Sequence, residues 1–315
     1  MNSESQPGAD LIVPLDPDEP LPWAGPGEAV RRALRRVTPS GLAVRWAARP
    51  RRFAEDELRE ARLAMEAIVA HTPRAGEVEE LAVAWLREQA AIEEMFWRPW
   101  LLRRRRWSGT EHRDEALATG RGVLFSYVHR GPFHSLPDLV PDRERRLIDV
   151  TGDFITEPAP PNRWGRRLVL MRRVAARTGL TVLLAPGSFP ALVALLERGE
   201  RVRIAFDMPG GHRMTWLGKP VDISMGTARL AWMTGSPIVP VWLSRDGARH
   251  VGEFGEVLHP EDHGSLEELQ EALAAAHERA VLEAPEMLEN PRRPGAWEEG
   301  ATADGWFRPQ RGGPA

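Results

Sequence analysis

The sequence predicts an α/β protein with a single domain, in which a mainly parallel central sheet is flanked by helices and preceded by a helical N-terminal portion. From residue 122 onward, short β-rich segments alternate with helical stretches, as they do in βαβ units. The run "VLFSYV" at 123–128 is almost continuously apolar, which is typical of a parallel strand buried on both faces. A hydrophobic content of 42% over 315 residues is sufficient for one large core.

The expected elements follow from periodicity. Apolar residues recur with a period close to 3.6 in 53–70 and continue among charges in 78–96, so both segments are predicted helices. Further helices are expected at 162–178, 188–198, 226–234 and 265–282. Strands are expected at 122–128, 146–152, 181–185, 201–207, 221–224 and 236–244.

The two ends of the chain differ in composition from the rest. Residues 1–27 are acidic and Pro-rich, and residues 291–315 are rich in Pro, Gly and charge. We therefore expect a flexible leader and a C-terminal tail around an α/β domain at 28–290. Within that domain, 28–107 is the helical portion and 122–290 the sheet core.

Composition excludes several classes of function. The chain has no cysteine, which removes disulfides, thiolate metal sites and cysteine nucleophiles. The net charge of −3 gives no general reason to expect nucleic acid, and Lys219 is the one lysine among arginines, as a GC-rich, actinobacteria-like genome would produce. The leader has neither the basic nor the apolar region of a signal peptide, and no window reaches the roughly 18–20 apolar residues of a spanning helix. We expect a cytoplasmic protein without metal or redox cofactors.

The stretch "VLFSYVHRGPFHSLPD" at 123–138 places His129 just beyond a predicted strand, where open α/β sheets carry their sites. A neutral imidazole there could take a proton from a hydroxyl or an amine; equally, His129 could simply cap the strand end. The five-residue spacing to His134 does not match a helical two-histidine metal site. A serine hydrolase is disfavoured because no G-x-S-x-G motif is present.

A second informative block runs from 195 to 246. Asp207 directly follows an apolar strand within it, and it could be functional or an ordinary turn-initiating aspartate. The glycines of "DMPGGH" match neither a P-loop nor a dinucleotide fingerprint, and we interpret them as a turn after the strand.

Together the two blocks resemble the lipid A late-acyltransferase-like branch of the lysophospholipid acyltransferases, which includes mycobacterial phosphatidylinositol mannoside acyltransferases. In that branch a strand ends in His-x-Gly-Asn-Trp-Glu/Asp, and the same frame here reads "HRGPFH" at 129–134. Downstream, the family shows L-x-x-G-x-x-V, a strand-end acid, an aromatic-Gly loop, G-x-A-x-L-A and T-G-x-P-I-V-P. The counterparts in this chain lie at 196–202, Asp207, 216–218, 226–231 and 234–240. The resemblance covers roughly residues 28–299.

The resemblance implies an acyltransferase that moves a fatty acyl group from acyl-CoA or acyl carrier protein, with His129 as the general base. The family acid that orients this base maps onto His134, which supplies no negative charge. We therefore hypothesise that Asp207 is the acidic partner of His129 and that His134 orients the base or contacts the acceptor. A substrate-binding arginine of the family lies in the region of 166–177. Arg173 and Arg177, four residues apart, are our choice, although a solvated basic face explains them equally well.

Two further expectations concern contact with apolar substrates and with the membrane. Phe133 and Trp216 are candidates to line an acyl channel. The segment "MFWRPWLLRRRRW" at 95–107 combines aromatics with arginines, and is expected to lie at an anionic membrane surface or to meet an acidic carrier protein. The other interpretation is a helix end whose aromatics pack in the core.

Two functions of different classes remain. The first is an acyltransferase acting on a hydroxyl or amine of a lipid, sugar or specialised metabolite, with peripheral contact to the inner face of the membrane. The second is a repurposed, non-catalytic member that binds lipid or acyl carrier protein, which the replacement of the motif acid by His134 would favour. Retention of His129 favours the enzyme.

Overall fold

The computed structural model describes residues 9–22, 26–103, 105–133 and 147–289. Its centre is an eight-stranded sheet in the order β1-β5-β4-β6-β3-β9-β10-β2. The strands are β1 (Ile12–Val13), β2 (Arg105–Ser108), β3 (Val123–Tyr127), β4 (Leu147–Thr151), β5 (Thr181–Leu184), β6 (Arg201–Ala205), β9 (Ile238–Asp246) and β10 (Arg249–Phe254). Strands β5, β4, β6, β3 and β9 are mutually parallel, and β2 is parallel to β10. Only β1 and β10 run antiparallel to their inner neighbours among the described strands of this sheet, so the predicted mainly parallel sheet is confirmed.

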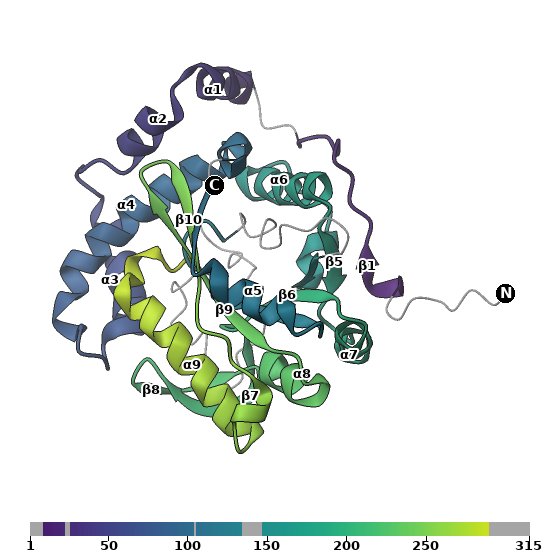
Figure 1. Ribbon diagram of the computed structural model, residues 1–315. Helices are drawn as coiled ribbons and strands as arrows, with labels where there is room; N and C mark the ends of the chain where they lie inside the picture. Colours follow the sequence, from purple (N-terminus) through teal and green to yellow (C-terminus); the bar gives the residue numbers. More distant parts are fainter. Residues whose placement is uncertain (1–8, 23–25, 104, 134–146, 290–315) are drawn as a thin grey trace.

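Helices cover both faces of the sheet (Figure 1). They are α1 (Pro26–Val37), α2 (Ser40–Ala47), α3 (Glu55–Val69), α4 (Val78–Phe96), α5 (Thr110–Ala118), α6 (Arg163–Thr178), α7 (Phe189–Glu197), α8 (Gly226–Thr234) and α9 (Leu266–Glu283). Strand β3 shows how the faces divide. Leu124 faces a core shared with α3, α4, α7, α8 and α9, whereas Val123 and Phe125 face a second core shared with α5 and α6. This burial on both faces explains the apolar run of β3.

Local sequence signals set the ends of the two longest helices after β4. Asn162 caps α6 by accepting a hydrogen bond from the Gly165 N–H at 3.0 Å, and Gly179 ends it in the left-handed conformation. Ser265 caps α9 by accepting from the Glu268 N–H at 3.1 Å. These caps lie within a few residues of the expected boundaries.

Three expectations about organisation need correction. The helical portion ends before 107, because residues 105–108 form β2 at the edge of the sheet. The glycines of "DMPGGH" do not form a turn: they belong to β7 (Pro209–Trp216), which forms a separate hairpin with β8 (Lys219–Ile223) and carries a register shift between Pro209 and His212. Helix α5 and strand β10 were not expected at all.

The last of the three corrected expectations concerns the leader, residues 1–27. Residues 9–22 are part of the fold, since Ile12 and Val13 pair with β5 at the sheet edge. Arginines of α6 hold the next residues: Arg173 Nε donates to the Glu19 carbonyl at 2.6 Å, and Arg177 Nη2 to the Pro17 carbonyl at 2.8 Å. Residues 26–27 begin α1, whereas residues 1–8 and 23–25 of the leader and the tail at 291–315 lie outside the described residues.

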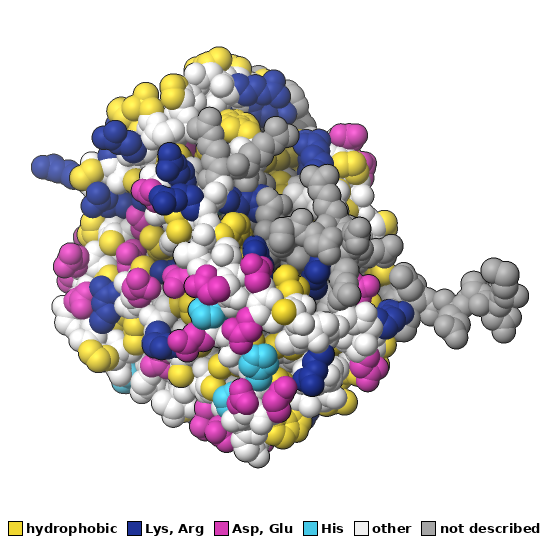
Figure 2. All heavy atoms as spheres, in the orientation of Figure 1, with side chains coloured by type: hydrophobic (Ala, Val, Ile, Leu, Met, Phe, Trp, Pro, Cys, Tyr) yellow, Lys and Arg dark blue, Asp and Glu magenta, His cyan; other side chains and the backbone are white. Residues whose placement is uncertain are grey.

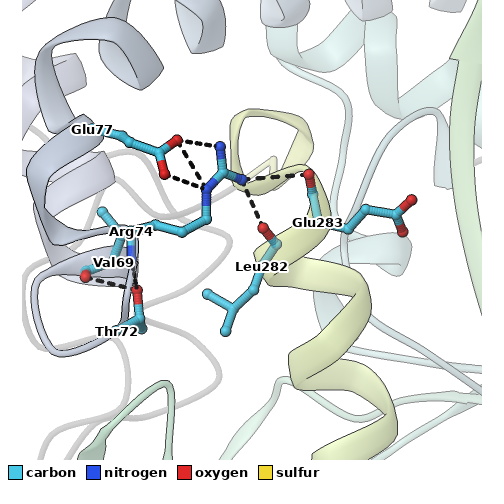
Figure 3. Close-up of polar contacts among 6 residues, drawn as sticks. All are labelled: Val69, Thr72, Arg74, Glu77, Leu282 and Glu283. Carbon is cyan, nitrogen blue, oxygen red and sulfur yellow. Dashed lines mark hydrogen bonds and ion pairs between the residues drawn. The ribbon is translucent and has the colours of Figure 1, made fainter.

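After α9 the chain returns across the domain as a short strap, residues 284–289. Arg74, in the turn between α3 and α4, holds the end of α9 from which the strap departs (Figure 3). The Arg74 guanidinium is paired with Glu77 and donates from Nη1 to the Leu282 carbonyl at 2.7 Å. Trp85 Nε1 and Gln89 Nε2 of α4 both donate to the Leu288 carbonyl, which fixes the far end. Within the described part of the chain, no helix has the length and apolar content needed to cross a membrane.

Candidate active site

The site lies where two neighbouring parallel strands end. Tyr127, the last residue of β3, is in register with Ala205, the last residue of β6. The Phe206 N–H donates to the Tyr127 carbonyl at 2.7 Å, which continues the ladder by one step. His129 and Asp207 each come two residues after their strand, so matched register brings the two side chains to the same edge of the sheet.

His129 and Asp207 are joined by two hydrogen bonds. The ring Nδ1 of His129 lies 2.8 Å from Asp207 Oδ1, and the backbone N–H of His129 donates to Oδ2 at 2.9 Å. Asp207 has no exposed surface and His129 is only 5% exposed. A carboxylate can only accept, so Nδ1 carries a proton, which leaves Nε2 as the nitrogen that can act as a base. The structure therefore brings together the two residues hypothesised to form the catalytic pair.

Aromatic rings enclose the imidazole. Phe133 meets it edge-to-face at 4.9 Å between ring centroids, and Tyr127 does so at 5.6 Å. Phe133 is half-buried, and its expected position beside an acyl chain stays a prediction. Such packing restricts rotation of the imidazole and lowers the local dielectric constant, which strengthens the interaction with Asp207.

The turn after His129 is held by backbone contacts. Gly131 has φ +60° and lies so close to β9 that a Cβ there would be 2.4 Å from the Leu243 carbonyl oxygen. Its N–H donates to the Met287 carbonyl at 2.8 Å, and the His129 carbonyl accepts from the Glu289 N–H at 2.7 Å. The strap thus clamps the turn from the outside.

These contacts also limit where an oxyanion could be bound. The backbone N–H groups of residues 129, 130, 131 and 133 all donate within the protein, to Asp207, Val128, Met287 and Gly131 respectively. They are therefore occupied as donors. A carbonyl undergoing attack beside His129 needs its hydrogen-bond donors from other groups.

A buried ion pair lies beneath this edge on the α6 face. Arg203 of β6 makes a bidentate contact with Asp149 of β4, including Nη2 to Oδ2 at 2.7 Å, and its guanidinium stacks 5.6 Å from the Tyr127 ring. Burial, followed by the negative charge of Asp149, raises the pKa of the Tyr127 hydroxyl far above its usual value. Tyr127 is therefore a neutral hydrogen-bonding group and not a proton carrier near pH 7.

A second buried histidine lies on the opposite face. His277 of α9 is fully buried, its Nε2 lies 2.9 Å from Ser126 Oγ, and its Nδ1 accepts from Trp242 Nε1 at 3.1 Å. Burial lowers the pKa of His277 to about 3, so the ring is neutral. Because Trp242 donates to Nδ1, the proton is on Nε2 and points at Ser126. His277 consequently cannot activate Ser126 as a nucleophile in this arrangement.

The other expected site residues are placed differently. Trp216 has no exposed surface and packs edge-to-face on Phe206 at 5.5 Å between ring centroids, so it is a core residue. The side chains of Arg173 and Arg177 donate to backbone carbonyls of residues 17–19 in the leader, and their expected contact with substrate stays a prediction. His134 lies outside the described residues.

Sequence reasoning missed a third arginine of α6. Arg167 forms an ion pair with Glu289, the residue whose N–H holds the His129 carbonyl, and its guanidinium lies 4.9 Å from the Phe96 ring. Glu289 lies 160 positions from the base along the chain, and no motif links it to the site. The Arg-rich composition of α6 and the family resemblance pointed to this helix, but not to Arg167 itself.

No family model matches this chain, and no curated protein matches it either. Among solved structures, it is similar to the 1-acyl-sn-glycerophosphate (LPA) acyltransferase PlsC from Thermotoga maritima, with 16% sequence identity and a TM-score of 0.37 over 72% of this chain and 95% of that chain. The similarity is low, and the function proposed below rests on the residues of this chain.

Proposed function

We propose that this protein is an acyltransferase that moves a fatty acyl group from acyl-CoA or acyl carrier protein to a hydroxyl or amine of a lipid, sugar or specialised metabolite. The observation that carries the proposal is the His129–Asp207 pair at the carboxyl ends of β3 and β6. The acyl part of the proposal comes from the motif blocks around these two residues, which resemble those of the lysophospholipid acyltransferases. The sheet and its flanking helices are compatible with that fold.

The chemistry follows from the tautomer of His129. Nε2 takes the proton of the acceptor hydroxyl or amine as its oxygen or nitrogen attacks the thioester carbonyl. The new C–O or C–N bond forms, the C–S bond breaks, and the imidazolium returns its proton to the departing thiolate. Asp207 keeps Nδ1–H in place and stabilises the transient positive charge on the ring.

Asp207 also supplies the negative charge that the sequence lacks at position 134. The family's motif acid is replaced by His134, and a site without a carboxylate would lose much of the stabilisation of the imidazolium. In triads of this type, the loss of the aspartate charge lowers kcat by about 10⁴-fold. Asp207 supplies a carboxylate from the neighbouring strand, and this favours an enzyme over a repurposed binding protein.

The proposal is tested by incubating the purified protein with medium- and long-chain acyl-CoA or acyl carrier protein and a panel of acceptors, including lysophospholipids, glycolipids, sugars and amines. Mass spectrometry then detects acylated product and free thiol. Wild type is expected to form product and His129→Ala to form none. His259→Ala is the matched control, because His259 also lies near a carboxylate, 3.2 Å from Glu115, but at the surface. A wild-type protein that binds donors without turnover would instead support the repurposed binding protein.

A further inference from the structure

The first two helices of the domain carry large apolar side chains that face outward. Val30, Leu34 and Val37 recur at spacings of four and three, so they share one face of α1, and Leu42 and Trp46 do the same on α2. Their exposed fractions lie between 56% and 77%. We refer to these five residues as the α1–α2 face. Scattered apolar side chains are common on surfaces, but a set aligned on consecutive helices is not.

This orientation is fixed by packing on the inner side. Val44 of α2 is fully buried against Ala91, Met95 and Leu101. Below α1, the buried Arg98 guanidinium donates from Nη1 to the Arg35 carbonyl at 2.7 Å and the Thr38 carbonyl at 3.0 Å. Trp100 adds a hydrogen bond from Nε1 to Ser40 Oγ at 3.1 Å. The helices are therefore held from one side, and the high exposed fractions of the five side chains show that the α1–α2 face is not covered by the domain. Figure 1 shows α1 and α2 at the periphery of the molecule.

Positive charge is concentrated around this face. Residues 26–52 contain eight arginines and one glutamate, a formal charge of +7. Since the whole chain carries −3, the rest of it carries −10. Arg31, Arg32, Arg36, Arg45 and Arg49 are all exposed. Figure 2 shows apolar side chains and arginines next to one another at the end of the molecule where α1 and α2 lie.

We propose that the α1–α2 face docks onto an anionic phospholipid bilayer. Apolar side chains on an amphipathic helix insert at the boundary between headgroups and acyl chains, while arginines on its flanks contact lipid phosphates. Arginine suits this position, because its apolar stem extends along the surface and its guanidinium binds phosphate with two hydrogen bonds. A second copy of this chain is disfavoured as the occupant, since it would place one +7 segment against another.

This assignment differs from the one that the sequence suggested. Within 95–107, Met95, Phe96, Arg98 and Leu101 are buried, so they cannot contact lipid in this structure. The interfacial character lies instead in α1 and α2, which rest on the buried side chains of that segment. The docking surface does not depend on the proposed acyl transfer, since none of its residues belongs to the His129 site.

The test is flotation of the full-length protein with vesicles of phosphatidylcholine alone and of phosphatidylcholine mixed with phosphatidylglycerol. Wild type is expected to float with the mixed vesicles, less so as salt is raised, and poorly with phosphatidylcholine alone. Each arginine near an anionic surface contributes about fivefold in affinity, so Arg31→Ser/Arg32→Ser/Arg36→Ser should lower the partition coefficient about 100-fold. Leu34→Ser/Trp46→Ser should lower it at least about tenfold.

Matched controls are available on the same chain. Trp232→Ser/Met233→Ser removes an exposed apolar pair of α8, and Arg198→Ser/Arg229→Ser/Arg279→Ser removes three exposed arginines elsewhere. Both controls should bind like wild type. The proposal is overturned if wild type does not float with anionic vesicles, or if the α1–α2 variants float as the controls do. It is also overturned if light scattering shows a dimer that Leu34→Ser/Trp46→Ser converts to a monomer, because the face is then covered by a second copy.

Discussion

The backbone N–H of Glu289 donates to the His129 carbonyl at 2.7 Å, while the Glu289 side chain is paired with Arg167 of α6. The candidate base is thus held on two sides. Asp207 holds the ring and backbone N–H of His129 from within the sheet, and the strap after α9 holds its carbonyl from outside. Through Arg167, the strap is also tied to α6.

A first prediction concerns this clamp. Arg167→Leu and Glu289→Gln each remove the same ion pair, and a small displacement of a catalytic group lowers rates steeply. We expect each variant to lower kcat for acyl transfer about tenfold, and the double variant to be no slower than the single ones, because contacting residues are not additive. Steady-state kinetics on the four proteins measures this. Independent, multiplying losses would show that Arg167 and Glu289 do not act together.

A second prediction separates two effects of replacing a glycine: the strain of a side chain at positive φ, and the steric clash of its Cβ with a neighbouring strand. Gly131 and Gly247 both have φ +60°, but a Cβ at Gly247 meets nothing within 4 Å, whereas one at Gly131 meets the Leu243 carbonyl. Gly247→Ala should therefore cost only the conformational strain, about 1 kcal/mol of unfolding free energy. Gly131→Ala should cost more and should also abolish turnover, because relieving the collision moves His129. Urea unfolding and activity measured on both variants would contradict this if the two behaved alike.

The third prediction concerns pH. Burial lowers the pKa of His277 from the usual histidine value of 6.5 to about 3, so between these pH values the unfolded chain binds a proton at this residue and the folded protein does not. The corresponding stability is fully present above about pH 6.5 and is lost as pH falls toward 3. Between about pH 7 and pH 5, the wild type should lose about 2 kcal/mol more unfolding free energy than His277→Gln.

Urea unfolding at several pH values measures this difference. Burial also lowers the pKa of His250 to about 3, and it contributes equally in both proteins. Parallel curves for wild type and His277→Gln would show that His277 is not neutral in the fold.

A fourth prediction concerns the buried ion pair. Arg203→Ala or Asp149→Ala leaves one charge unpaired inside the protein and should cost about 3–5 kcal/mol of unfolding free energy. The double variant Asp149→Leu/Arg203→Met should recover most of that loss, since neither charge remains. Arg213→Ala breaks the exposed pair with Asp222 and should cost about 1 kcal/mol or less. If the double variant is as unstable as the single ones, the pair has a structural role beyond charge neutralisation.

Much of the fold could be predicted from periodicity. Helices α4 and α6 and strands β3 and β9 carry long apolar patterns, and their expected boundaries agree with the structure to within two residues. The missed elements lack such patterns. Strand β2 reads "RRWS" and β1 has two residues, because edge strands bury little surface and need few apolar side chains. Strand β7 alternates exposed and half-buried positions around two glycines, which look like a turn when the pairing with β8 is unknown.

The site was partly predictable for a related reason. Parallel strands end at one edge of a sheet, so strand-end residues such as His129 and Asp207 can be expected to meet once the strands are known to be neighbours. The contact of Glu289 with His129 could not be inferred, because it depends on the path of the chain after α9. Arg173 and Arg177 matched the family region, yet their positions on α6 direct them to the leader.

The most direct measurement is acyl transfer by Asp207→Asn, with folding verified by circular dichroism and with Asp222→Asn as a control carboxylate in the β7–β8 hairpin. The substitution keeps the size of the side chain and removes its charge, so it removes the stabilisation of the imidazolium and the preference for the Nδ1–H tautomer. We predict a loss of about 10⁴-fold in kcat in a folded protein. Turnover equal to wild type would contradict the assignment of His129 and Asp207 as the catalytic pair.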